Sequence, residues 1–403
     1  MREAHQCLVD DPGADLYHTF FDDHVKFQYP PSSLLFFEAL PPSMLAAMDN
    51  ARISPLRGLT TTGLLDGEYF AHQALDWLSL AAILTTVLVS AAILELGLSH
   101  LAAANWIIWP GAPARFVVCL VLGLTYYPLL RAYWLGQIQV FLDALVALAL
   151  LFYLLGREVS TGLCIGICCL VKPQYGLVLL WSVLRQRWRL ALGFVAIFSA
   201  GLTASLIRFG LQNHLRYLEV LRTIGSRGET YWANQSVNGL VNRLLLNGDP
   251  VTFSHTEFPP FHPIVYAVTV LSSAAILVLA LWPPKSARCA DGRLADLMLV
   301  LAAATIASPV AWEHHYGTFL PLFAAALPVL IHSCPFGAVT APLFALSYVA
   351  IANVMLRPAL IFRNPWLGLT GSHLFFGSLI FLGLLLALRA VSSGASNTLA
   401  GRR

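Results

Sequence analysis

The chain has 403 residues, of which 58% are hydrophobic and only 11% are charged, and its mean hydropathy is +0.70. A soluble domain carries about a quarter of its residues as charged ones, so this composition excludes an ordinary soluble protein and predicts that lipid solvates much of the chain. The net charge of +3 is too small, and the basic residues too scattered, to predict a nucleic-acid partner. The seven cysteines have neither disulfide nor metal-ligand spacing, so neither a metal site nor a cofactor is expected.

The first 74 residues contain no apolar run that could cross a bilayer, and no cleavable signal peptide opens them. They carry Asp, His, Pro and aromatic residues with weak helical patterning. Their hydrophobicity is too high for a disordered tail, which predicts a folded cap on a membrane domain.

Apolar runs of membrane-spanning length begin after residue 74. They are 75–98, 114–130, 137–156, 189–209, 263–283, 294–311, 316–333, 336–356 and 372–391. The apolar stretch 159–184 is interrupted at Lys172-Pro173-Gln174, where proline disfavours a continuous helix, so it predicts two short helical pieces meeting at a polar break. The expected fold is an all-α polytopic membrane protein of about ten to eleven transmembrane segments. Its expected parts are a loop region 1–74, helices 75–209, a second loop 210–262, helices 263–391 and a tail 392–403.

The orientation follows from Lys and Arg in short loops, which favour the cytoplasm. The most basic loop is 185–189, followed by 285–293 and the tail from Arg389. Placing these inside, with a cytoplasmic C-terminus, puts the remaining polar segments outside: 1–74, 131–136, the Lys172 break, 210–262, 312–315 and 357–371. Arg357 and Arg363 count mildly against this assignment. The expected location is the cell (inner) membrane.

The outer placement of residues 1–74 has a consequence for the start of the chain. A segment of this size needs a preceding transmembrane helix to deliver it across the membrane, and the sequence begins without one. We therefore expect that Met1 is not the true start and that one more helix precedes it.

Unusual polar residues gather on the predicted outer face. They are Gly136-Gln137-Ile138-Gln139, Lys172-Pro173-Gln174, Tyr231 to Ser236, Ser308-Pro309 and Trp312-Glu313-His314-His315. Ionisable groups at membrane depth are costly unless they face a wet cavity, so together they predict a functional site.

Each of these residues has a plain interpretation beside the functional one. Lys172 could snorkel to the interface, or its ammonium could bind a phosphate group as a compact point charge. His314 and His315 could be interfacial. If they serve a site, adjacent residues of a helix face different ways, so one ring at most is expected to line it. Histidine spacing of i, i+4 is absent here, which argues against a metal.

The remaining amide, tryptophan and acidic residues also have two interpretations each. Asn234 and Gln235 could tie down the loop or hydrogen-bond sugar hydroxyls, and Trp232 and Trp312 could be interfacial anchors or stack on sugar rings. The N-terminal acids could be solvated charges, or one could act as a general base. These acids are Asp10, Asp11, Asp15, Asp22 and Asp23.

In combination, the motifs resemble glycosyltransferase family 87, the polyprenol-phosphate-mannose-dependent mannosyltransferases of the GT-C class. The matching stretches, in the family's order, are Tyr29-Pro30-Pro31, Gly136-Gln137, Lys172-Pro173-Gln174 with the basic loop 185–189, Asn234-Gln235-Ser236 with Gly239 and Arg243, and Ser308-Pro309 followed by Trp312-Glu313-His314-His315. Gln139 departs from the family, whose members usually have Asn there.

The resemblance implies a GT-C-like helical bundle with a cavity open to the outer leaflet. It implies an inverting transfer of a sugar, typically mannose, from a polyprenyl-phosphate donor to a glycolipid or glycan acceptor. The family's presumed base is an Asp in an Asp-x-x-x-Tyr motif after the first transmembrane helix, which would lie before Met1. Lys172 would bind the leaving phosphate. The other expected substrate-binding residues are His314, His315, Glu313, Gln137, Asn234 and Gln235.

Two alternatives remain. A transporter or flippase of lipid-linked sugars would spread polar residues through the membrane depth and on both faces, whereas here they concentrate on one. An inactive, truncated remnant would bind lipid only.

Overall fold

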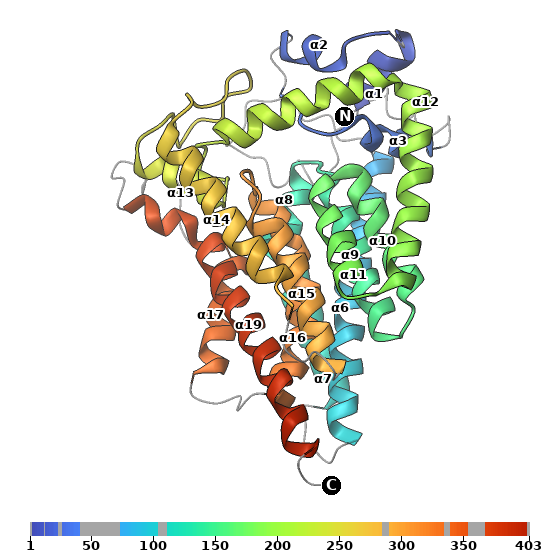
Figure 1. The fold of residues 1–403 in the computed structure, drawn as a ribbon, viewed down its shortest axis with the longest axis vertical. Coiled ribbons are helices and arrows are strands. Elements are labelled where there is room, and N and C mark those ends of the chain that lie inside the picture. The colour runs from blue at the N-terminus through green and yellow to red at the C-terminus, as the bar shows by residue number, and fades with distance from the viewer. Residues whose placement is uncertain are drawn as a thin grey trace.

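A computed structural model describes residues 2–11, 13–22, 26–40, 73–103, 111–283, 290–333, 339–353 and 367–400. These ranges are almost entirely helical and contain no strand beyond one isolated bridge between Asn234 and Trp312. Most of the helices run side by side along the long axis, and the N-terminal segment lies across one end of them (Figure 1). Asp23, Lys285, Arg357 and Arg363 lie outside the described residues.

The apolar runs form helices where the sequence predicts them. Five of the described helices are long and apolar enough to cross a membrane, or six if the bent pair α7 (Ala112–Leu124) and α8 (Tyr127–Trp134) is one span. The five candidate spans lie in α6 (Gln73–Ala103), α12 (Trp188–Arg227), α14 (Pro263–Leu281), η3 (Glu313–Thr318) with α16 (Phe319–Ser333), and η4 (Leu367–Ser372) with α19 (His373–Ala400). The chain is therefore an all-α, multi-pass membrane protein, and the count of ten to eleven segments stays a prediction.

Shorter apolar helices complete the bundle. They are α9 (Gln139–Leu154), α10 (Glu158–Val171), α11 (Gly176–Leu184), α15 (Ala290–Ile306) and α17 (Thr340–Ala352). The predicted break between α10 and α11 is confirmed: Lys172 is extended (φ −132°, ψ 102°) and η2 (Pro173–Tyr175) follows. Arg187, just after α11, pairs with Glu158 at the start of α10 at 2.8 Å. The two helices therefore form a hairpin whose tip is Lys172.

Helices α10 and α12 approach so closely that glycine is required on both. A Cβ at Gly162 would lie 2.1 Å from the carbonyl oxygen of Leu190, and one at Gly193 would lie 2.2 Å from that of Val159. Small residues allow such backbone contact between membrane helices. Further along, a Cβ at Gly201 would meet the side chain of Leu170. The contacts advance together along both chains, so the two helices run parallel from the same end.

Helix α12 turns sharply at Gly210, whose positive φ of 74° is a conformation that glycine adopts without a steric penalty. Beyond it the chain stays helical to Arg227, where the sequence predicted a loop from residue 210. Figure 1 shows this second arm crossing one end of the bundle, beside α1 (Arg2–Asp10), α2 (Leu16–Asp22) and α3 (Leu35–Glu38). The predicted boundary at 209/210 thus coincides with a corner rather than with the end of a helix.

The second arm and the N-terminal segment share a small hydrophobic core. Its buried members include Leu8, Leu16, Tyr17, Phe20, Phe27, Leu34, Phe209, Tyr217, Val220 and Ile224. Asn213 strengthens the contact, because its Oδ1 accepts a hydrogen bond from the backbone nitrogen of Leu16 at 3.0 Å. The described residues 2–11, 13–22 and 26–40 therefore pack as a cap, and the rest of the predicted cap, to residue 72, lies outside the described residues.

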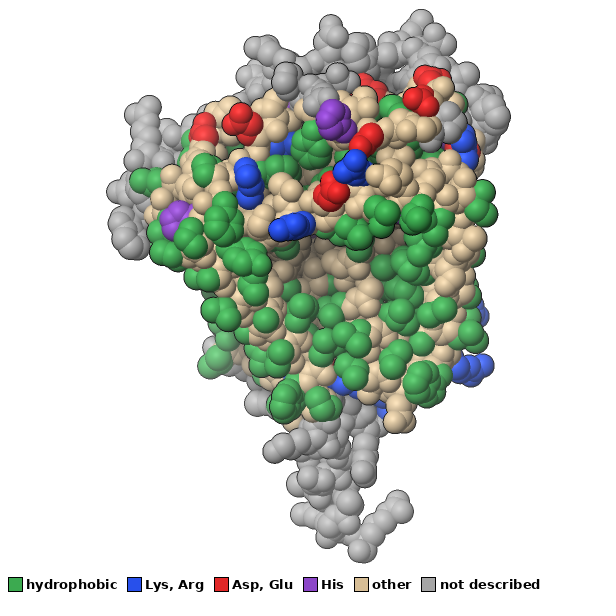
Figure 2. All heavy atoms as spheres, turned by 45° about the horizontal axis from the view of Figure 1, so that its top comes forward, with side chains coloured by type: hydrophobic (Ala, Val, Ile, Leu, Met, Phe, Trp, Pro, Cys, Tyr) green, Lys and Arg blue, Asp and Glu red, His purple; other side chains and the backbone are tan. Residues whose placement is uncertain are grey.

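Charged side chains gather at both ends of the bundle, in different arrangements. Figure 2 shows acidic and basic side chains around a hollow at the capped end, above a broad hydrophobic wall. At the opposite end, Asp296 accepts hydrogen bonds from Trp181 Nε1, Arg185 Nε and Arg389 Nη1 at 2.8, 2.6 and 3.2 Å. The basic loop 185–189 therefore lies at the end away from the cap.

Candidate functional site

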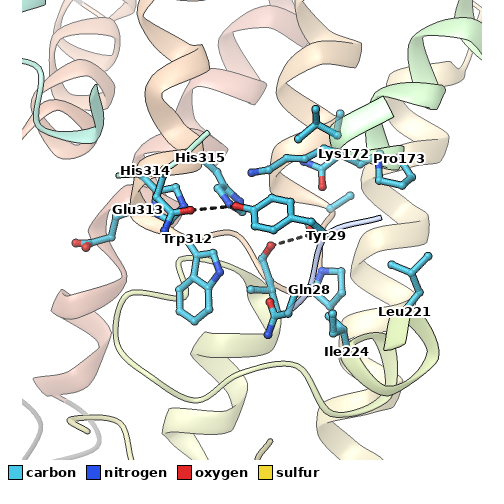
Figure 3. Close-up of a pocket in the computed structure, with 18 of the residues that line it drawn as sticks. Gln28, Tyr29, Lys172, Pro173, Leu221, Ile224, Trp312, Glu313, His314 and His315 are labelled. Carbon is cyan, nitrogen blue, oxygen red and sulfur yellow. Dashed lines mark hydrogen bonds between the residues drawn. The ribbon is translucent and has the colours of Figure 1, made fainter. Parts of the chain in front are cut away.

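A cavity of about 880 Å³ lies beneath the cap. Its wall brings together segments that are far apart in sequence: Gln28 and Tyr29 from the cap, Lys172 from the hairpin tip, and Trp312 to His315 before α16 (Figure 3). Five of the seven residues predicted to bind substrate line this cavity. They are Gln137, Lys172, Glu313, His314 and His315.

The hairpin tip places Lys172 in the wall. Only 7% of the residue is exposed, and its Nζ donates to Gln139 Oε1 at 2.6 Å. The backbone of Lys172, just before Pro173, is extended. This ends α10 and directs the Lys172 side chain away from the course of the helix. An ammonium has three N–H donors, so the bond to Gln139 leaves two for a ligand.

Both histidines face the cavity, although helical geometry predicted that one at most would do so. They lie in η3, a 3-10 helix, and their rings meet edge to face with centroids 4.7 Å apart. His314 Nε2 and His315 Nδ1 are buried with no hydrogen-bond partner among the described residues. Figure 3 shows Lys172 reaching toward the same space. These nitrogens are therefore available to a bound molecule.

Glu313 is the one acidic residue among the described residues that line the cavity. Its Oε2 accepts a hydrogen bond from Tyr127 Oη at 3.0 Å and lies 3.5 Å from Arg131 Nε, while Oε1 has no partner. Arg131, which also lines the cavity, was not singled out from the sequence; its signal was a lone basic residue in the predicted outer loop 131–136. Arg131 and Lys172 give this wall a positive balance against a single carboxylate.

Gln137 is linked to the cap. Its Oε1 accepts a hydrogen bond from Tyr29 Oη at 3.0 Å. Burial raises the pKa of Tyr29 to about 12, so the phenol keeps its proton at physiological pH and can donate it. The Tyr29-Pro30-Pro31 motif thus closes one side of the cavity.

Asn234 and Gln235 lie behind the wall rather than in it. Asn234 Nδ2 donates to the carbonyl oxygens of Glu229 and Pro309 at 2.8 and 3.2 Å, and its Oδ1 accepts from the backbone nitrogen of Ala311 at 2.9 Å. Gln235 Nε2 donates to the carbonyls of Trp232 and Gly371. Both are fully buried, so the expected contacts with sugar hydroxyls are not offered by this geometry; the amides tie the loop down instead.

The rest of this motif is structural as well. The guanidinium of Arg243 is buried and donates to the carbonyls of Thr230, Tyr231 and Asn234 and to Ser372 Oγ, the last at 2.8 Å. Of the two tryptophans, Trp312 lines the cavity and Trp232 does not. The N-terminal acids Asp10, Asp11 and Asp15 also lie outside the lining set.

Another part of the lining, the apolar wall, is hydrophobic. It includes Val171, Leu177, Leu180, Leu221, Ile224 and Leu277. Leu180 and Leu221 are 48% and 37% exposed. An aromatic group joins this wall, because Trp312 and Tyr231 pack around Phe253 with centroid distances of 5.8 and 5.5 Å. The cavity can therefore accept a molecule with an anionic group at one end and a hydrocarbon portion.

Comparison with known proteins agrees with this composition of the site. The sequence model of glycosyltransferase family 87 matches residues 27–309. A polyprenol-phosphate-mannose-dependent α-(1-2)-phosphatidylinositol pentamannoside mannosyltransferase of Mycolicibacterium smegmatis is 26% identical over 204 residues, covering 50% of this chain and 45% of that protein. The protein of the same description from Mycobacterium tuberculosis is 28% identical over 196 residues, covering 48% of this chain and 41% of its own length.

The matched part spans less than half the length of each of these relatives. No solved structure matches the chain. The family match runs from the cap through the hairpin tip to the Ser308-Pro309 motif and covers well over half of the sequence. The chain belongs to glycosyltransferase family 87.

Proposed function

We propose that this protein is a membrane glycosyltransferase. It moves a sugar, mannose by analogy with its relatives, from a polyprenyl-phosphate donor to a hydroxyl of a glycolipid or glycan acceptor, with inversion at the anomeric carbon. The observation that carries the proposal is the cavity itself. Its lining brings together the ammonium of Lys172, one ring nitrogen each of His314 and His315 that has no partner among the described residues, and the apolar wall.

The polar wall suits the phosphate of the donor. Lys172 supplies a point charge with two free N–H donors, and Arg131 adds a second cation to the lining. His314 and His315 offer ring nitrogens that hydrogen-bond the phosphate or the sugar. Preorganised donors aimed at a group that gains charge during the reaction stabilise the transition state, and a departing phosphate is such a group.

The apolar wall suits the isoprenoid chain. Leu180 of α11 and Leu221 of the second arm of α12 both line the cavity and are partly exposed. Each buried methylene contributes about 0.8 kcal/mol of transfer free energy, so even a short stretch of prenyl chain on this wall adds substantially to affinity. A donor of this kind therefore enters from the bilayer with its phosphate toward Lys172.

The transfer is a single displacement. The acceptor oxygen forms a bond to the anomeric carbon while the bond from that carbon to the phosphate oxygen breaks, and its electron pair leaves with polyprenyl phosphate. The proton of the acceptor hydroxyl passes to a general base. We do not assign this role to Glu313, because Tyr127 and Arg131 already hold its carboxylate; Glu313 and Gln137 instead orient the substrates.

We infer that the capped end faces the outside of the cell membrane and that the C-terminus is cytoplasmic. The basic loop 185–189 and the cavity lie at opposite ends of the α10–α11 hairpin, and short basic loops favour the cytoplasm. In a background whose seven native cysteines are replaced by serine or alanine, a cysteine placed at Val251 in the outer loop should react with a membrane-impermeant thiol reagent in intact cells, and one placed at Trp188 should not. The reverse pattern would overturn the orientation.

The function is tested by sugar transfer from polyprenyl-phosphate mannose in purified protein reconstituted in lipid. Lys172→Ala should lower kcat/KM for the donor about a thousandfold, because it removes the charge that meets the phosphate. Exposed Arg189, in the basic loop at the far end, provides the matched control, and Arg189→Ala should retain wild-type transfer. Unchanged turnover in Lys172→Ala, or no transfer by the wild type to any glycolipid acceptor, would refute the proposal.

A further inference from the structure

Behind Lys172, a polar chain leads from the cavity wall into the helix bundle. Lys172 Nζ donates to Gln139 Oε1 at 2.6 Å, and Gln139 Nε2 donates to Asp143 Oδ1 at 2.7 Å. Gln139 and Asp143 are buried, with 1% and 0% exposure, and neither lines the cavity. They lie four residues apart on α9 and so share one face of that helix.

The chemistry of the three groups fixes the direction of this chain. An ammonium only donates hydrogen bonds and a carboxylate only accepts them, whereas an amide does both. Gln139 can therefore bridge Lys172 and Asp143 in one orientation alone, with its oxygen toward the ammonium. A hydrogen bond to a charged group is worth more than one between neutral groups, so both charges hold the amide in place.

Asp143 also contacts η3, the segment that carries His314 and His315. A Cβ at Gly317 would lie 1.9 Å from Asp143 Oδ2, so the carboxylate packs directly on the backbone of η3, two residues beyond His315. Oδ2 has no hydrogen-bond partner among the described residues. A buried carboxylate without compensation is costly. The charge that compensates it is the ammonium of Lys172, through Gln139.

We propose that Gln139 and Asp143 are positioning residues, which keep the ammonium of Lys172 charged and aimed at the donor phosphate. This inference rests on the proposed function. In an apolar surrounding, an isolated lysine loses its proton or swings toward water. The buried carboxylate of Asp143 opposes loss of the proton, and the hydrogen bond to the Gln139 oxygen opposes movement of the ammonium toward water. Two N–H donors of Lys172 remain directed at the cavity. The role depends on Lys172, because neither Gln139 nor Asp143 reaches the cavity itself.

The test is equilibrium binding of polyprenyl phosphate, the leaving group, to the detergent-purified full chain. Gln139→Leu removes both hydrogen bonds of the bridge and should weaken binding about tenfold, and Asp143→Asn should do the same by removing the counter-charge. In transfer assays the donor KM should rise by a similar factor, with the acceptor KM unchanged. Gln139→Met, which keeps the length of the side chain but neither of its hydrogen-bonding groups, offers a second variant should Gln139→Leu not fold.

A matched control lies between the same two helices. Thr161 of α10 is fully buried and its Oγ1 donates to the carbonyl of Ala149 in α9 at 3.2 Å, away from the cavity. Thr161→Val should bind polyprenyl phosphate as the wild type does. Wild-type affinity in the Gln139 variants, or tighter binding in Asp143→Asn, would overturn the inference, since the carboxylate would then only repel the phosphate.

A double-mutant cycle separates positioning from a general effect on folding. On a Lys172→Ala background, Asp143→Asn should change the affinity for polyprenyl phosphate by less than twofold, because the group it acts through is gone. A full tenfold loss there would show that Asp143 acts without Lys172. If the wild type neither binds polyprenyl phosphate nor transfers sugar, the proposed function fails; if Lys172→Ala alone loses binding, only the positioning role fails.

Discussion

Two sets of polar residues lie within the same capped end of the molecule and differ in how their atoms are used. Around the cavity, His314 Nε2, His315 Nδ1 and Glu313 Oε1 have no partner among the described residues. In the loop behind it, Asn234 Nδ2 and Arg243 Nη1 donate to backbone carbonyls. Both sets are buried, so burial alone does not distinguish them.

The difference between the two sets indicates which polar atoms are free to bind a substrate. A buried polar atom without a partner costs free energy, and three such atoms, on Glu313, His314 and His315, belong to consecutive residues that line this cavity. The satisfied set stabilises the loop that carries Tyr231 to the cavity and that pairs Asn234 with Trp312. Substitutions in the first set should therefore impair transfer, and substitutions in the second should impair folding.

Among the substitutions that separate these two sets, the largest effect is expected at Arg243. Arg243→Ala leaves the carbonyls of Thr230, Tyr231 and Asn234 without their shared donor, so the free energy of unfolding should fall by about 3 kcal/mol. Thermal unfolding in detergent measures this, and the donor KM of the protein that remains folded should not change. Arg189→Ala, at an exposed arginine, should leave stability within about 0.5 kcal/mol of the wild type. A raised donor KM with normal stability would place Arg243 in the binding set.

A smaller effect of the opposite kind is expected at the open wall. His315→Ala should lower kcat about thirtyfold, equivalent to about 2 kcal/mol, because the unpartnered ring nitrogen no longer reaches the phosphate or sugar. It should not reduce stability, since the ring makes few hydrogen bonds to lose. Exposed His332, at the other end of α16, supplies the control, and His332→Ala should act as the wild type. If His315→Ala lowered the stability without lowering kcat, the proposed difference between the two sets would be wrong.

The smallest effect is expected where the cap meets the wall. Tyr29→Phe removes the donor to Gln137 Oε1 and should raise the donor KM about threefold. Because burial holds the pKa of Tyr29 near 12, this ratio between variant and wild type should stay constant from about pH 6 to about pH 9. A ratio that collapses toward one within that range would mean that the phenol ionises there, contrary to its buried position.

The sequence predicted the elements whose signals are local. Proline after Lys172 marks the hairpin tip, and apolar runs of about 20 residues mark the spans. The second arm of α12 was not predicted as a helix, because Asn213, His214 and Arg216 interrupt its apolar pattern. Its buried face exists only because the cap packs on it.

The residues of the site were predictable to a lesser extent, for a physical reason. An amide such as Asn234 looks the same in sequence whether it meets a ligand or its own backbone, and only the fold decides. Both histidines line the cavity, although adjacent residues of a 3-10 helix point about 120° apart. The cavity therefore extends around more than one side of η3, which the run Trp312 to His315 does not predict. Asp143, in contrast, carried a usable signal: an acidic residue within an apolar span is a candidate for function.

The parallel packing of α10 on α12 determines how far the hairpin tip lies below the corner of α12. Leu170 lies level with Gly201, nine residues before the corner at Gly210, and Lys172 is two residues nearer that corner. At about 1.5 Å per residue, the hairpin tip therefore lies about 10 Å below the corner. The first arm of α12, from Trp188 to Gly210, is long enough to match the roughly 30 Å hydrocarbon layer. A phosphate that meets Lys172 must then descend below the level of the neighbouring lipid headgroups. Bilayer thickness thereby becomes a variable of the reaction, and thinner membranes should favour it.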